Sequence, residues 1–161
     1  MSKSDVDAAA SIAARCKELG FVMRKSLEVA DSRGELYVSP CGDGMAYTWR
    51  RRDRSTTLHA IAVRKDCRLH GVGGALMARI VADGLSRDHT ILRARCPETL
   101  PSNRFYARLG FSLGTTEIGR LTKLNVWELR LAPFANSPDI LCGRWPHQHG
   151  HSRPGGVADR D

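Results

Sequence analysis

Two periods of hydrophobic residues occur along residues 1–131, and each predicts a different kind of element. In residues 5–19 the apolar positions recur at helical spacing, which predicts an amphipathic helix that ends at Gly20. The same period in residues 71–85 predicts a second helix. Residues 21–34 follow neither period, so no element is predicted for them.

Short segments of strand-like pattern, bounded by turn residues, account for most of the rest. Three of them follow one another closely and predict an antiparallel meander, and the last two predict a closing hairpin. Residues 101–111 predict a short helix with Ser102 as its cap and Gly110 as its end. The predicted strands are residues 34–40, 45–51, 57–63, 89–96, 112–119 and 123–131.

The order of these elements predicts the fold class. Helix, three strands, helix, strand, helix and two strands indicate an α/β (α+β) fold around a mixed, mostly antiparallel central sheet. A length of 161 residues fits one domain, which we expect in residues 1–131. Residues 132–161 are rich in Pro, Gly and His without periodicity, so we expect a polar C-terminal tail there.

Composition narrows the class of protein further. Hydrophobic residues make up 42% of the chain and charged residues 26%, which is ordinary for a soluble globular protein. No apolar run is long enough for a membrane span, and no signal-peptide stretch opens the chain. The five cysteines form no CxxC pair, which argues against a disulfide framework and structural zinc. We therefore expect a cytoplasmic protein.

The charge balance points to an anionic ligand. Net charge is +8, and most of the excess lies in residues 55–131. A nucleotide cofactor and a nucleic acid both fit this excess, and a solvated arginine-rich surface is the alternative. Strongly cationic acceptors such as polyamines fit it poorly. Two further clusters are better explained as solvated segments. The histidines of residues 147–151 could bind a metal, but no metal site is expected. The predicted turn with Trp49, Arg50, Arg51, Arg52 and Arg54 could bind an acidic acceptor such as nucleic acid, a phosphorylated metabolite or an acidic peptide, but a solvated turn is favoured.

The segment CRLHGVGGAL, residues 67–76, lies between a predicted strand and a predicted helix. Gly71, Gly73 and Gly74 leave the helix start without side chains. The first N–H groups of a helix have no partner within the helix, and the helix dipole adds positive charge there. This arrangement is typical of a pyrophosphate site, and Arg68 stands directly before it. Neither a Walker A loop nor a dinucleotide fingerprint fits the segment.

Two motifs together resemble the GNAT superfamily of acyl-CoA-dependent N-acyltransferases. Arg68, Gly71 and Gly73 match the family's [RQ]-x-x-G-x-[GA] pattern, and residues 103–111, NRFYARLGF, are similar to its N-x-x-Y-x-x-L-G-F segment. The resemblance covers residues 35–131. It implies a GNAT-like sheet flanked by helices and an N-acetyltransferase with acetyl-CoA as acyl donor.

The resemblance also implies which residues bind the donor. The end of the third strand would contact the pantetheine arm, the loop that follows would hold the pyrophosphate through its backbone, and Asn103 would contact the cofactor. Arg64, Arg104 and Arg108 are our own candidates for the outer phosphates. The implied cofactor-binding residues are Ile61, Ala62, Val63, Arg68, Leu69, His70, Gly71, Val72, Gly73, Gly74 and Asn103.

Tyr106 occupies the family's general-acid position, where it would protonate the departing thiolate. A half-buried aromatic residue beside Phe105 is the structural alternative. Cys96 ends a predicted strand and is better explained as a core residue than as an acyl-accepting nucleophile.

His59 is a candidate general base, because its position resembles that of the strand histidine in arylalkylamine acetyltransferases. Strand alternation places it on one face with Thr57 and Ile61, and it would take the amine proton through water. A strand histidine without a catalytic part is the alternative. Glu98 and Glu35 are weaker candidates.

The expected reaction is direct transfer of an acetyl group to a primary amine of a small molecule, a protein or an RNA. A non-catalytic acyl-CoA-binding module and a basic nucleic-acid-binding protein are the alternatives. Dimers are common among proteins that resemble this family, so a homodimer is one expected state. No membrane partner is expected.

Overall fold

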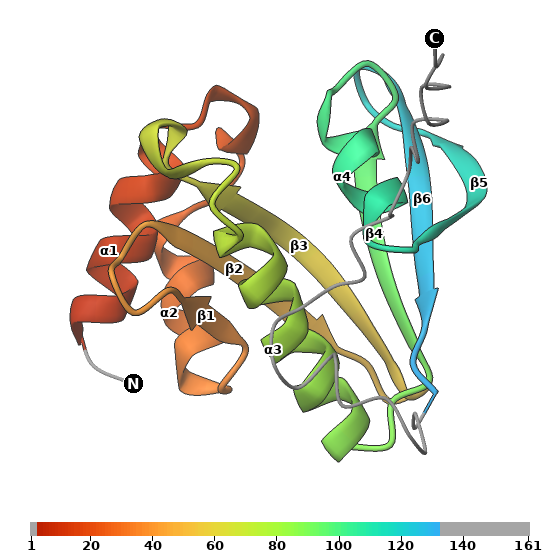
Figure 1. Ribbon diagram of the computed structural model, residues 1–161, viewed down its shortest axis with the longest axis horizontal. Helices are drawn as coiled ribbons and strands as arrows, with labels where there is room; N and C mark the ends of the chain where they lie inside the picture. Colours follow the sequence, from red (N-terminus) through yellow and green to blue (C-terminus); the bar gives the residue numbers. More distant parts are fainter. Residues whose placement is uncertain (1–2, 133–161) are drawn as a thin grey trace, which may run out of the picture.

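Six strands form one sheet, and four helices pack against it, in residues 3–132, the part of the chain that this computed structural model describes (Figure 1). The strands are β1 (Leu36–Val38), β2 (Gly44–Arg50), β3 (Ser55–Val63), β4 (Ile91–Pro97), β5 (Ser112–Ile118) and β6 (Lys123–Arg130). The helices are α1 (Lys3–Ala14), α2 (Arg24–Ser32), α3 (Val72–Ser86) and α4 (Ser102–Arg108), with 3-10 turns η1 (Lys17–Leu19) and η2 (Lys65–Cys67).

The strand order is β1-β2-β3-β4-β6-β5, and only the β3–β4 pair is parallel. The expected meander, the closing hairpin and the mixed, mostly antiparallel sheet are therefore confirmed. The tail expected in residues 132–161 lies outside the described residues, except for its first residue.

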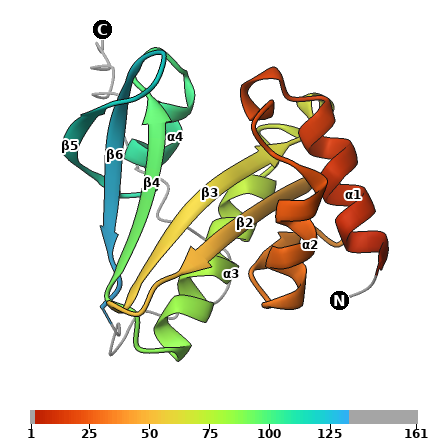
Figure 2. The same cartoon turned by 180° about the vertical axis from the view of Figure 1, so that it is seen from behind.

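The two faces of the sheet carry separate hydrophobic cores. Helices α1 and α2 cover β1 to β3 on one face, and α3 and α4 pack on the other (Figures 1 and 2). Behind β4, β6 and β5 no helix of the described chain covers the sheet (Figure 2). Trp127 belongs to the α3–α4 core together with Tyr106 and Leu131.

Two helix predictions need correction at the N-terminal end. Helix α1 ends at Ala14 rather than near Gly20, because Cys16 adopts an extended conformation and the chain continues into the separate turn η1. Helix α2 was not predicted. It buries only Leu27 and Ala30, and this stripe is too narrow to stand out in the sequence.

The predicted cap of α4 is also wrong. Pro101 is the N-cap residue and gives no side-chain cap bond, so Ser102 is already the first helical residue. Gly110 does follow the helix in the left-handed region, with φ of 86°, as expected of a helix stop.

A buried ionic network joins α2, β1, β2 and α3. Glu35 is 1% exposed, and its Oε1 accepts hydrogen bonds from the backbone N–H of Arg50 at 2.7 Å and from the Arg50 Nε at 3.1 Å. Its Oε2 lies 3.1 Å from the Arg33 Nε. Arg50 also lies 3.5 Å from Asp83, which accepts a hydrogen bond from the Tyr37 hydroxyl. Glu35 is therefore a structural group and not a base.

The same network corrects the expectation of a solvated arginine turn. Arg50 ends β2 and is largely buried, while Arg51, Arg52 and Arg54 lie in the exposed turn that follows. Sequence neighbours thus have different environments, because the strand continues through Arg50.

We expect Glu35→Gln to lower the free energy of unfolding by about 3 kcal/mol, since removing one partner of a buried ion pair leaves the other charge uncompensated. Urea unfolding measures this change. The matched control is Glu28→Gln, because Glu28 pairs with Arg24 on an exposed helix surface and should cost less than about 0.5 kcal/mol. Equal costs for the two variants would contradict the structural role of Glu35.

Within the described residues, no helix is long and apolar enough to cross a membrane.

Candidate functional site

The sheet opens between β3 and β4. The two strands pair from Ser55–Ile91 to Leu58–Ala94, and no pairing between them follows in the described chain. Beyond that point their ribbons diverge, with β3 leading toward α3 and β4 toward α4 (Figures 1 and 2). The remainder of β3, including Ile61, Ala62 and Val63, therefore has a strand neighbour on one side only, which is β2.

The loop after β3 enters α3 through two left-handed residues. Leu69 has φ of 65° and is 93% exposed, and Gly71, the N-cap of α3, has φ of 81°. A Cβ on Gly71 would meet nothing within 4 Å, so the backbone at this helix start is open. An exposed helix N-terminus with alternating backbone conformations, such as that of α3, favours the binding of an anion. His70 lies between Leu69 and Gly71, and Val72 and Gly74 belong to the first turn of α3.

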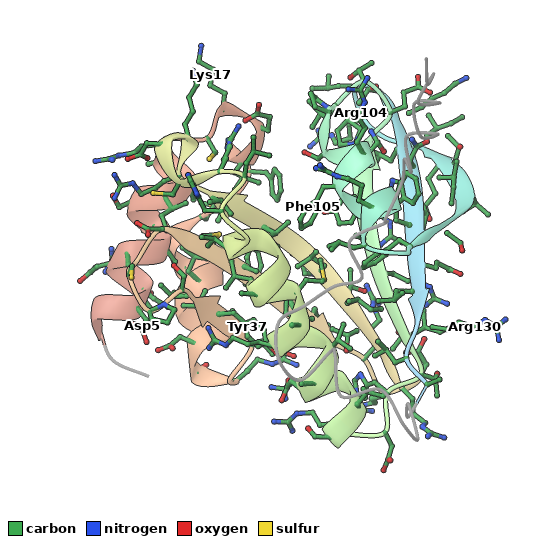
Figure 3. The ribbon with its side chains drawn as sticks, viewed as in Figure 1. Asp5, Lys17, Tyr37, Arg104, Phe105 and Arg130 are labelled. Carbon is green, nitrogen blue, oxygen red and sulfur yellow. The ribbon has the colours of Figure 1, made fainter. Side chains whose placement is uncertain are left out.

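Arg68 and Gly73 tie this loop to its surroundings. The Arg68 Nε donates a hydrogen bond to the Val63 carbonyl at 3.2 Å, which holds the guanidinium beside the end of β3. A Cβ on Gly73 would lie 3.1 Å from the Phe105 ring, so α4 reaches α3 at this position. Figure 3 shows Phe105 between the two parts of the sheet. Any larger residue at Gly73 would push Phe105 away.

A pocket of about 400 Å³ lies beside the loop, between the end of α1 and η2. Five of its nine lining residues are basic. Arg64, one of them, lies 2.6 Å from Asp66 and 3.4 Å from Asp43, so its charge is largely compensated. The pocket is lined by Ile12, Arg15, Cys16, Lys17, Glu18, Arg64, Lys65, Asp66 and Arg68.

The structure separates the three arginines considered for the outer phosphates. Arg64 lines the pocket, whereas Arg104 and Arg108 belong to α4 on the other side of the opening (Figure 3). The sequence did not point to Arg15 and Lys17 as pocket residues, because its pattern predicted one continuous helix through residue 19. The helix break at Cys16 decides their position.

Tyr106 lies deep in the core below the opening. It is 6% exposed, and its ring contacts Phe105, Phe111 and Trp127 with centroid distances of 5.5, 5.4 and 6.3 Å. Burial, and secondarily the nearby Cys96, raise the pKa of Tyr106. Within the described chain its hydroxyl has no hydrogen-bond partner. Tyr106 is thus fully rather than half buried, and it keeps its proton at neutral pH.

Burial also raises the pKa of Cys96 to about 11, so this residue stays a neutral thiol in the core. That environment agrees with the structural interpretation of Cys96 and disfavours a nucleophile, which would need a lowered pKa.

Asn103 joins α4 to β4 and β6 through its side-chain amide. The Nδ2 donates to the carbonyls of Pro97 and Leu100, each at 2.8 Å, and lies 3.3 Å from that of Glu98. The Oδ1 accepts hydrogen bonds from Asn125 at 3.0 Å and Trp127 at 2.8 Å. Both ends of the amide are therefore used within the protein.

The side-chain amide of Asn103 therefore has a structural role, and the cofactor contact expected of Asn103 stays a prediction. The amide holds the start of α4 against the end of β4, and so it positions Phe105 and Tyr106 beside the opening. No free lone pair or N–H is left for a ligand without breaking one of these bonds.

His59 is the extra residue of a β-bulge. Tyr47 pairs with Ala60 and Thr48 with Leu58, so His59 has no partner of its own on β2. The bulge reverses the alternation of side chains: Leu58 joins the α3–α4 core, and Ala60 joins the α1–α2 core. The expectation that His59 shares a face with Ile61 is therefore wrong.

The His59 ring lies on the α1–α2 side. It stacks on Tyr47 at 5.4 Å and meets Trp49 edge-on at 6.3 Å. Desolvation lowers the pKa of His59, and the charges of Arg51 and Arg95 lower it further. The imidazole is therefore neutral at pH 7, as a proton acceptor must be.

Glu98 is exposed in the loop after β4. Residues 3–132 contain no group of three His, Cys, Asp or Glu side chains that could hold a metal ion, and the histidines of residues 147–151 lie outside them.

A sequence model of the acetyltransferase (GNAT) domain matches residues 12–113, which is more than half of the chain. No curated protein is significantly similar to the chain in sequence.

Solved structures share the fold at low sequence identity. The ribosomal-protein-S18-alanine N-acetyltransferase of Escherichia coli superposes with a TM-score of 0.68 at 19% identity, over 82% of this chain and 91% of that one. Ard1 from Thermoplasma volcanium gives 0.72 at 16% identity, over 82% and 95%.

A third structure, from Bacillus anthracis str. Ames, is assigned as a streptothricin acetyltransferase and was crystallised with acetyl coenzyme A. It gives a TM-score of 0.52 at 19% identity, over 55% of this chain and 56% of that one. The fold, the open glycine loop and above all the domain match lead to one conclusion: the chain belongs to the GNAT family of acetyltransferases and is an acyltransferase.

Proposed function

We propose that this protein transfers an acetyl group from acetyl-CoA to a primary amine by direct attack, and that residues 1–131 form its single catalytic domain. One observation carries the proposal: β3 loses its β4 neighbour after Leu58 and then leads into an open, glycine-rich helix start. An extended ligand arm can add to the free strand, and its phosphates can bind the loop.

The residues at this opening fit the donor. Ile61, Ala62 and Val63 would contact the pantetheine arm, and the backbone from Arg68 to Gly74 would hold the pyrophosphate. The left-handed conformations of Leu69 and Gly71 support this, since they leave the loop backbone accessible. Arg64 would serve an outer phosphate from the pocket side, and Arg104 and Arg108 from α4. Asn103 would act by positioning α4.

The chemistry joins nitrogen to the acetyl carbon and breaks the bond from that carbon to sulfur. A backbone N–H near Val63 would stabilise the negative charge on the carbonyl oxygen. Tyr106 would give its proton to the departing sulfur. Its raised pKa keeps the proton on the hydroxyl at neutral pH, and it also makes Tyr106 a weaker acid than a free tyrosine. His59 would accept the proton released by the amine, through water.

The structural neighbours support an amine acceptor without selecting one. One is named for a ribosomal-protein alanine and another for streptothricin, which are chemically different amines. The common element is the reaction.

The test measures thermal unfolding with and without acetyl-CoA, followed by thiol release with a panel of amines. At 100 times Kd, a ligand stabilises the fold by about 2.7 kcal/mol, which is roughly 5–10 °C for a chain of this length. A shift together with amine-dependent thiol release supports the proposal. A shift without thiol release for any amine would indicate an acyl-CoA-binding module instead.

The pH dependence tests His59. Because its pKa lies below the usual 6.5, kcat/KM of the wild type should fall only at acidic pH, on a limb with a midpoint below 6.5. We expect His59→Gln to lower kcat/KM by about tenfold or more above that midpoint and to remove the limb. An unchanged limb in this variant would exclude His59 as the base.

A further inference from the structure

The face of the sheet opposite α3 and α4 carries an aromatic and cationic surface at the opening. His59 and Arg95 follow Leu58 and Ala94, the last paired residues of β3 and β4, so they flank the point where the strands part. Trp49, 43% exposed, contacts the His59 ring edge-on. This is the side from which an acceptor can approach His59.

Three arginines surround these aromatic rings. The Arg33 guanidinium lies 4.2 Å from the centre of the Trp49 ring. Arg51 donates a hydrogen bond through Nε to the Thr57 hydroxyl at 3.2 Å, and Thr57 is the cross-strand partner of Trp49. After desolvation, the charges of Arg51 and Arg95 are the further causes that lower the pKa of His59.

The carboxylates of this region are already used by other arginines. Glu117 receives two contacts from Arg95, at 2.9 and 3.3 Å. Glu35 is buried between Arg33 and Arg50. Arg93, two residues before Arg95 on β4, is likewise paired, with Glu128 at 2.9 Å.

Arg51 differs from Arg33, Arg50, Arg93 and Arg95, which all pair with a carboxylate. Among the residues of the described chain, no carboxylate lies within ion-pair distance of its guanidinium, and only its Nε has a hydrogen-bond partner. Its two terminal nitrogens are therefore available on an exposed surface next to the His59 ring. A planar guanidinium whose two terminal NH2 groups are free is suited to a carboxylate or a phosphate.

We propose that the acceptor is an amine that also carries a carboxylate or phosphate group, and that Arg51 binds this anionic group while the amine faces His59. This inference rests on the proposed function and specifies its acceptor. The anionic group compensates the excess positive charge of the surface, which repels a purely cationic amine.

The experiment compares matched acceptors at saturating acetyl-CoA: phosphoethanolamine with ethanolamine, and β-alanine with β-alaninamide. We expect kcat/KM to be higher by about tenfold or more for the anionic member of each pair, as a charge-assisted hydrogen bond provides. Arg51→Gln should abolish this preference. The control Arg52→Gln, which removes the same charge from the same exposed turn, should retain it.

Equal rates within both pairs, a higher rate for the cation spermidine, or a preference that survives in Arg51→Gln would overturn the inference. Calorimetric binding of phosphoethanolamine and ethanolamine to the wild type and both variants, with and without CoA, decides the question independently of turnover. If acetyl-CoA does not bind, the proposed function is refuted. Phosphoethanolamine binding that depends on Arg51 would still support the anion site, and its absence would refute it.

Discussion

Replacing Tyr106 with Phe is expected to lower kcat by about 10²- to 10⁴-fold, the usual contribution of a general acid, while the Kd for acetyl-CoA stays unchanged. The reason is that only the proton donor is lost. The ring contacts with Phe111 and Trp127 remain, and no protein group of the described chain loses a hydrogen bond. Single-turnover thiol release measures the chemical step, and calorimetry measures the affinity.

The matched control is Tyr37→Phe. Tyr37 is also a buried tyrosine, but its hydroxyl donates a hydrogen bond to Asp83 in the ionic network away from the opening. This variant should lose stability and keep its kcat. If Tyr106→Phe instead turns over within about threefold of the wild type, the departing sulfur leaves as an anion or takes its proton from another group.

Gly71→Asp is expected to weaken acetyl-CoA binding by at least about 100-fold with little loss of stability. At about 4 Å and an effective dielectric constant near 20, an added negative charge repels each phosphate charge by roughly 4 kcal/mol. The fold should tolerate the change, because Asp accepts the left-handed region better than most residues and a carboxylate at a helix N-terminus is favourable. The measurement is the thermal shift with acetyl-CoA.

Gly110→Asp provides the control for the backbone. Gly110 also has a positive φ, of 86°, and a Cβ there would likewise meet nothing within 4 Å. It follows α4 rather than opening α3, so its variant should keep the acetyl-CoA shift. If Gly71→Asp binds acetyl-CoA like the wild type, the loop does not hold the pyrophosphate.

The strength of local patterns explains which elements could be predicted. The helix over residues 71–85 and the strands on either side of it have long, regular apolar periods, and they appear in the structure as α3, β3 and β4. Gly73 makes room for Phe105, which is distant in sequence, but Gly71 reflects a backbone requirement that acts within a few residues, a left-handed N-cap. Such requirements are visible in a sequence because the chain satisfies them locally.

By itself, then, the sequence determined the fold class, the glycine loop and the family, since each depends on residues that are near one another in the chain. Tertiary structure alone decided the environments of the individual side chains. A bulge at His59 moved its ring to the α1–α2 face, and the Asn103 Oδ1 accepts hydrogen bonds from Asn125 and Trp127 on β6. Arg50 was buried against Glu35 while Arg51 stayed free. In each case the deciding neighbour is distant in sequence, and no local pattern specifies which strand it lies on.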